Sequence, residues 1–151
     1  MQPVLPDDPP MFFFGTLMDG DVLAAVLGRP VAPESMEPAR LRGWRRVGIA
    51  GRSYPMLTPH ATGAVDGLLV HGLDERDRNH LDYYEGPEYR VALLTVRLRD
   101  GREMTAETYL CQPGIVASRS EWRLETWRLR HKRSALARIR ALMAGIIRRW
   151  G

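Results

Sequence analysis

A tyrosine-rich segment near the middle of the chain holds the densest group of side chains that could do chemistry. Residues 81–90 read Leu-Asp-Tyr-Tyr-Glu-Gly-Pro-Glu-Tyr-Arg, which places Glu85 among three tyrosines. A carboxyl group that is partly desolvated among aromatic rings has a raised pKa and can exchange protons near neutral pH. Lone acidic residues are mostly solvent-exposed, so this segment alone also fits Glu85 and Glu88 flanking a helix end in water.

Other kinds of catalytic site lack the residues that they need. The four histidines are scattered, and Cys111 is the only cysteine, so neither a metal-ligand cluster nor a disulfide framework is expected. We find no glycine-rich phosphate loop, no dinucleotide fingerprint and no nucleophile elbow around any of the five serines. The remaining possibility is acid–base chemistry by a carboxylate, together with the backbone groups of a tight loop.

The composition is that of an ordinary globular protein. The chain has 151 residues, of which 44% are hydrophobic and 26% charged, a size that suits one domain with a real core. We find no signal peptide and no apolar run long enough to span a membrane. The single cysteine favours a reducing compartment, so the sequence predicts a cytoplasmic protein.

The net charge of +4 is unevenly distributed. Residues 121–151 contain nine Lys or Arg and two Glu, a charge of +7, whereas residues 1–120 carry −3. The high isoelectric point therefore belongs to the C-terminal region and says little about the partner of the main domain. No base-stacking motif accompanies the basic residues, and we do not expect nucleic-acid binding.

Hydrophobic patterns and turn residues predict a mixed α+β fold with a curled sheet. The expected elements are a strand over 11–14, a helix over 22–27, strand segments over 39–50, 54–57 and 65–71, a helix over 73–84, strands over 88–99 and 102–110, and a helix over 120–150. Asp19 or Asp21 is expected to cap the first helix. Asp100-Gly101 predicts a two-residue hairpin turn. The strand over 11–14 and the helix over 73–84 must position the candidate site.

We divide the chain into a disordered segment over 1–10, a domain over 11–120 and a basic amphipathic helix over 121–151. The apolar residues of that helix recur at spacings of three and four: Leu136, Ile139, Leu142, Met143, Ile146, Ile147 and Trp150. Such a stripe packs on its own domain or on a second subunit, as in a homodimer. The basic flanks and terminal Trp also fit a helix that lies on a membrane surface, which we favour less.

Two motifs resemble those of a known family. Phe14-Gly15-Thr16-Leu17 follows an apolar strand and resembles the Tyr-Gly-Thr/Ser-Leu signature of the γ-glutamylcyclotransferase family, in its AIG2-like branch. Residues 81–90 resemble its second signature, Leu-Asp-x-aromatic-Glu-Gly followed by Tyr. The two motifs occur in the family's order, with a hairpin after the second, and the resemblance covers about residues 11–112.

The resemblance implies a compact mixed β-barrel with a few helices, and no metal or cofactor. Members cyclise the γ-glutamyl group of a small γ-glutamyl amine or amide to 5-oxoproline and release the amine. Glu85 matches the catalytic acid/base, and the backbone of Gly15, Thr16 and Leu17 matches the substrate loop. Phe14 and Tyr89 are further candidates for substrate contact. We therefore expect Glu85 to face residues 15–17 across one pocket.

Two positions depart from the family pattern. Phe14 replaces the signature tyrosine, and Val91 stands where many members have arginine. Both changes bear on substrate choice, and neither removes the carboxylate. Because one fold can serve several functions, a non-catalytic binding module that meets its partner through the basic C-terminal helix remains an alternative. The sequence does not identify the γ-glutamyl substrate.

Overall fold

The computed structural model describes residues 9–150, with side chains described as far as residue 146. Most of the segment predicted to be disordered, residues 1–8, lies outside the described residues. The elements are β1 (Met11–Phe13), η1 (Thr16–Met18), α1 (Gly20–Leu27), η2 (Pro33–Ser35), β2 (Met36–Ile49), β3 (Pro55–Val70), α2 (Glu75–Glu85), η3 (Gly86–Glu88), β4 (Tyr89–Leu98), β5 (Glu103–Cys111), β6 (Ala117–Glu121), α3 (Leu124–Arg130) and α4 (Lys132–Trp150).

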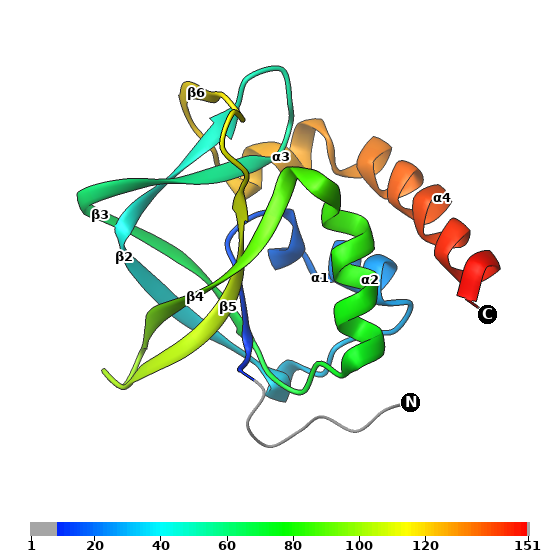
Figure 1. Cartoon of the computed structure of the whole chain (residues 1–151), viewed down its shortest axis with the longest axis horizontal. Coiled ribbons are helices and arrows are strands. Elements are labelled where there is room, and N and C mark those ends of the chain that lie inside the picture. Colours follow the sequence, from blue (N-terminus) through cyan, green and yellow to red (C-terminus); the bar gives the residue numbers. More distant parts are fainter. Residues whose placement is uncertain (1–8, 151) are drawn as a thin grey trace.

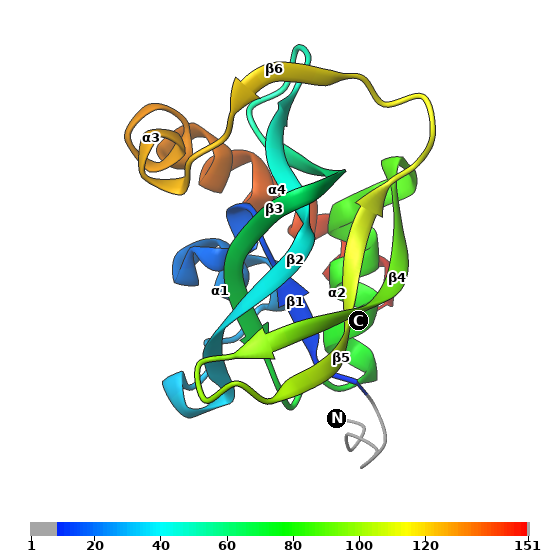
Figure 2. The same ribbon diagram turned by 90° about the vertical axis from the view of Figure 1, so that its left-hand side faces the viewer.

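The strands form a small closed barrel with helices gathered on one side (Figure 1). Their order is β3-β1-β5-β4-β2-β6, and an additional β3–β2 pairing closes the first five into a ring. All pairs are antiparallel except β1 with β5, which run parallel. Turned by 90°, the barrel strands cross in front of the helices (Figure 2). The predicted α+β barrel with a C-terminal helix is confirmed.

The short strand β1 separates two hydrophobic cores. Phe12 and Phe14 pack among residues of the barrel interior, which include Leu41, Val65 and Leu69. Met11 and Phe13 belong instead to the core beneath the helices. Because successive side chains of a strand point to opposite faces, a strand buried on both faces must be apolar throughout. This explains the uninterrupted run of apolar residues at the start of the domain.

β2 and β3 form a hairpin that is much longer than the sequence predicts. The segments predicted separately over 54–57 and 65–71 are parts of one strand, β3, and β2 begins at Met36, three residues before the strand segment predicted over 39–50. The middle of β3 is mostly exposed and pairs with β2 around a bulge at Gly43. Away from the core no alternation of apolar residues is needed, so the pattern that marks a strand is missing there.

One further expectation about the sheet was wrong, and one strand was missed. The hairpin between β4 and β5 turns through three residues, Arg99–Gly101, and not two. The last paired residues are Leu98 and Arg102, since the Leu98 N–H donates to the Arg102 carbonyl at 2.8 Å. Gly101 has φ 89°, as the last position of such a turn requires. β6 was not predicted, since its sequence Ala-Ser-Arg-Ser-Glu is largely exposed and pairs with β2 only near its two ends.

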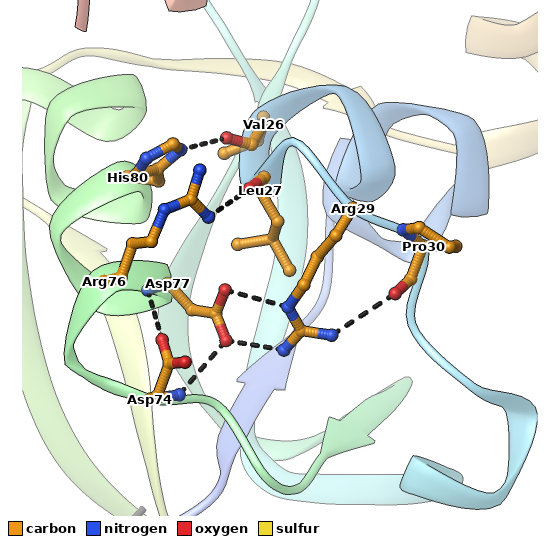
Figure 3. Close-up of polar contacts among 8 residues, drawn as sticks. All are labelled: Val26, Leu27, Arg29, Pro30, Asp74, Arg76, Asp77 and His80. Atoms are coloured by element: carbon orange, nitrogen blue, oxygen red, sulfur yellow. Dashed lines mark hydrogen bonds and ion pairs between the residues drawn. The ribbon is translucent and has the colours of Figure 1, made fainter. Parts of the chain in front are cut away.

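The start of α2 is fixed by a buried network (Figure 3). The Asp74 carboxylate accepts from the Asp77 N–H at 2.8 Å, and Asp77 accepts in return from the Asp74 N–H at 3.1 Å. This reciprocal capping satisfies N–H groups that a helix start leaves free. The fully buried Asp77 also pairs with Arg29, whose Nε donates at 3.1 Å. His80 Nδ1 lies 2.9 Å from the Val26 carbonyl, so α2 is attached to the end of α1.

The region over 121–151 contains two helices rather than the single predicted helix. The chain breaks the helical pattern at His131, between α3 and α4. Ile139, Met143 and Ile146 are buried in the core beneath the helices, together with Trp122 and Trp127 of the preceding segment. The face of α4 that carries them is therefore covered by its own domain.

One residue of the predicted stripe faces outward. Leu142 is 41% exposed, although it is adjacent to the buried Met143. Neighbouring residues of a helix lie about 100° apart, so spacing alone could not tell which of the two meets the core. Ile147 and Trp150, also placed in the stripe, lie outside the described side chains. Among the described residues no helix combines the length and apolarity needed to cross a membrane.

The difference between the two faces of α4 is testable. We expect Ile139→Ala to lower the free energy of unfolding by about 2–5 kcal/mol, because it leaves a cavity in the core. Leu142→Ala on the exposed edge is the matched control and should change it by less than about 0.5 kcal/mol. Urea denaturation measures both. Equal effects of the two substitutions would contradict the observed orientation of α4.

Candidate active site

A cavity of about 320 Å³ opens where the ends of several elements meet. Both sequence motifs contribute to its wall. Its lining consists of Phe12, Phe13, Phe14, Gly15, Thr16, Leu17, Tyr54, Pro55, Tyr84, Glu85, Pro87, Glu88, Tyr89 and Tyr109. Aromatic rings make up much of this surface, and Glu85 and Glu88 are its acidic residues. Such a concave, mostly apolar site with a few convergent polar groups suits a small ligand.

Glu85 is the last residue of α2, and the pKa of its carboxyl group is raised, as the sequence predicts. Protein atoms enclose its carboxyl group while one side opens on the cavity, so the residue is half-buried. Burial, followed by the nearby negative charge of Asp82, raises its pKa to about 8. Gly86 follows with φ 69°, a conformation that ends the helix and that glycine adopts without strain. The chain thus turns away immediately after the carboxylate.

Tyrosine hydroxyls join the two motifs. Thr16 Oγ1 and Tyr84 Oη lie 3.1 Å apart, a hydrogen bond between residues 68 positions apart in sequence. Burial raises the pKa of Tyr84 to about 12, so its hydroxyl stays protonated at neutral pH. Tyr109 donates to the Asp82 carboxylate at 2.5 Å. Burial also raises the pKa of Tyr89, whose hydroxyl donates to the Pro55 carbonyl at 3.4 Å.

The opposite wall is the turn from Gly15 into η1. Thr16 and Leu17 begin a helical turn, and the first N–H groups of a helix have no acceptor within it. N–H groups of this kind can bind an anion or a carbonyl oxygen. A Cβ on Gly15 would lie 2.9 Å from Pro55 Cγ, so only glycine allows this close approach to β3. The turn and the start of β3 are packed together at the cavity.

Two arginines contact residues of the lining without being part of it. Arg46 Nη1 donates to the Phe14 carbonyl at 2.9 Å, and burial lowers the pKa of its guanidinium. Arg52 pairs with Glu88 at 2.6 Å and also contacts the Tyr54 hydroxyl, at the opening of the cavity. Among the described residues that line the cavity, none is Lys, Arg or His. Positive charge near the cavity therefore comes from residues such as Arg46 and Arg52, which contact lining residues but do not line the cavity themselves.

All the residues proposed from the sequence line this one cavity: Glu85, Phe14, Gly15, Thr16, Leu17 and Tyr89. Their proximity was predicted, whereas the contributions of Arg46 and Arg52 were missed. In a chain with 22 Lys and Arg, no sequence signal distinguishes these two. Burial raises the pKa of the half-buried Cys111 to about 11, which leaves its thiol protonated and a poor nucleophile. No cluster of three metal-binding side chains occurs in the described part of the chain.

Comparison with known proteins identifies the family. The family model described as gamma-glutamyl cyclotransferase, AIG2-like, matches residues 11–129. The chain belongs to this family. AIG2-like protein A of Arabidopsis thaliana is 31% identical over 138 residues, which cover 88% of this chain and 80% of that protein. AIG2-like protein C of the same organism is 32% identical over 127 residues, covering 81% and 70%.

Solved structures agree with this assignment. A solution structure of an Arabidopsis thaliana protein matches with a TM-score of 0.62 at 27% identity, covering 90% of this chain and 91% of that one. A structure titled gamma-glutamyl cyclotransferase matches with a TM-score of 0.54 at 17% identity, covering 73% and 68%. At that identity the second match establishes a shared fold only. The family match ends within α3, so α4 follows the matched region.

The raised pKa of Glu85 has a measurable consequence for stability. Because the folded protein holds this proton more tightly than the unfolded chain, stability falls as pH rises from about 4.5 to about 8. Glu85→Gln has no such proton to lose. We therefore expect the melting temperature of Glu85→Gln relative to the parent protein to increase across this window and to level off above it.

The control is Glu34→Gln, which changes an exposed glutamate. Its melting temperature relative to the parent protein should stay constant between pH 5 and pH 9. If Glu85→Gln behaves in the same way, the carboxyl group of Glu85 is not desolvated in the folded protein.

Proposed function

We propose that the protein is a γ-glutamylcyclotransferase that converts a small γ-glutamyl amine or amide to 5-oxoproline and releases the amine. The observation that carries this proposal is the position of Glu85, a carboxyl group with a pKa of about 8 that lines the same cavity as the turn over residues 15–17. The proposal includes catalysis by Glu85, substrate contact by residues 14–17 and Tyr89, and a cytoplasmic location.

In the proposed reaction the substrate attacks itself. The α-ammonium group of the γ-glutamyl moiety transfers a proton to the Glu85 carboxylate and becomes a nucleophilic amine. This nitrogen then forms a bond to the γ-carbonyl carbon, and the amide bond to the leaving amine breaks. Glu85 returns the proton to the departing nitrogen. The new ring nitrogen gives its remaining extra proton to water and the released amine takes one up from water, so the enzyme ends in its starting state. A carboxyl group whose pKa lies close to neutral suits both transfers.

The turn opposite Glu85 is proposed to bind the negative charges of the reaction. As the amine attacks, the γ-carbonyl oxygen becomes an oxyanion, which N–H groups directed into the cavity stabilise. The Thr16 and Leu17 N–H groups, which have no acceptor within their own turn, are the proposed donors to this oxyanion or to the substrate carboxylate. Confinement among Tyr54, Tyr84 and Tyr89 holds the substrate in the bent conformation that cyclisation needs.

Activity is tested by 5-oxoproline release from a panel of γ-glutamyl compounds. We expect Glu85→Gln to lower kcat/KM at least about a hundredfold on any substrate that the parent turns over, because the proton acceptor is lost. The kcat/KM of the parent should also increase as pH rises through about 8, because the Glu85 carboxyl group ionises around that pH. Glu34→Gln should match the parent throughout.

Other outcomes have clear meanings. If Glu85→Gln turns over a confirmed substrate as fast as the parent protein, Glu85 is not the acid/base. If no compound in the panel releases 5-oxoproline, yet γ-glutamyl compounds bind by calorimetry, the protein is a binding module on the same fold.

A further inference from the structure

The turn that forms one wall of the cavity is attached to residues from the far end of the chain. The site loop, residues 14–19, connects β1 to α1 and includes η1. Within it, the Met18 N–H donates to the Gly15 carbonyl and the Asp19 N–H to the Thr16 carbonyl, both at 3.0 Å. These two bonds close a single short turn. A turn with so few internal bonds depends on outside contacts for its position.

Asp19 supplies one of those contacts. Its side chain is only 1% exposed, and Oδ1 accepts from the N–H groups of Asp21 and Val22 as the cap of α1. Oδ2 accepts from Arg128 Nε at 2.7 Å and lies 3.0 Å from Lys132 Nζ. Burial by itself would raise the pKa of Asp19, but these bonds outweigh it and hold the pKa below its usual value.

Arg46 supplies a second contact at the start of the loop. Its Nη1 donates to the Phe14 carbonyl, while its Nε donates to the Trp122 carbonyl at 3.2 Å. The guanidinium also lies over the Trp122 ring, 5.5 Å from the ring centre, in a cation–π contact. Both ends of the site loop are thus joined to the segment between Trp122 and Lys132.

We propose that Arg128 and Lys132 are positioning residues, which hold the N–H groups of the site loop in place through Asp19. The inference builds on the proposed function, because it gives the basic C-terminal helices a role in the same site. Neither side chain lines the cavity, so neither touches substrate. They act on the loop because Asp19 immediately follows η1 and cannot move without moving it.

The charges make this attachment sensitive. A buried carboxylate that loses its cationic partners is left uncompensated, at a much higher cost than the loss of an exposed ion pair. Arg128 and Lys132 are partly exposed, with 44% and 25% of their side-chain surfaces accessible, so both can be replaced without opening the core. Their removal should release Asp19, and with it the turn at the cavity.

The test compares two double variants with the same loss of charge on the same helices. Arg128→Gln with Lys132→Gln should speed amide hydrogen exchange at Met18 and Asp19 at least about tenfold, and lower kcat/KM roughly tenfold. Exchange in the β4–β5 hairpin should not change. Arg130→Gln with Arg133→Gln, at exposed positions, should leave exchange and kcat/KM as in the parent. A third double variant, Arg128→Lys with Lys132→Arg, keeps both positive charges and should show the exchange rates and the kcat/KM of the parent.

A triple variant separates positioning from general stability. Adding Asp19→Asn to Arg128→Gln with Lys132→Gln removes the unpaired charge but keeps a residue able to cap α1. We expect its melting temperature to recover while exchange at Met18 stays fast and kcat/KM stays low. If melting temperature, exchange at Met18 and kcat/KM all return to parent values in this triple variant, the proposal is overturned. It is also overturned if Arg128→Gln with Lys132→Gln shows the exchange and kcat/KM of the parent. If the parent releases no 5-oxoproline, the proposed function fails, and exchange at Met18 and Asp19 still decides the positioning.

Discussion

The fold depends on β1, a strand of three residues whose side chains are buried away from water on both faces. One face of this strand completes the barrel interior and the other completes the core beneath the helices, so neither core closes without it. Thr108 reinforces its place by donating to the Phe12 carbonyl at 2.9 Å. The cavity opens where this buried strand ends, and the rigidity of the two cores is what holds residues 14–17 opposite α2.

The carboxyl group opposite the loop has a special environment because of how α2 ends. The helix is fixed at its start by the Asp74, Asp77 and Arg29 network, and its last residue is Glu85. A rigid helix therefore holds a carboxyl group in an aromatic cavity without a cation in the lining. Desolvation is unfavourable for the folded state near neutral pH, which is a common exchange of stability for reactivity at functional sites.

The sequence predicted the parts of this structure that follow from local chemistry. The apolar run of β1, a cap of α1 at Asp19 or Asp21, of which the structure uses Asp19, and the two motifs at one cavity were all expected from residue types and from the family resemblance. β6 and the middle of β3 were not, because exposed strands need no alternation of apolar residues. The orientation of Leu142 was not, because spacing alone cannot separate neighbouring residues of a helix face. Arg46 was missed because its partners Phe14 and Trp122 are 32 and 76 residues away.

The central position of β1 also bears on the order of folding. Its strand partners are at Leu68–Val70 and Glu107, and the core on its helical face includes Ile146. A ribosome adds about 5–20 residues per second, so the most apolar segment waits several seconds for its last partners. Helices α1 and α2 can form earlier from local contacts. We expect the cavity to be among the last parts of the chain to form, and expression at lower temperature or with added chaperones to favour soluble protein.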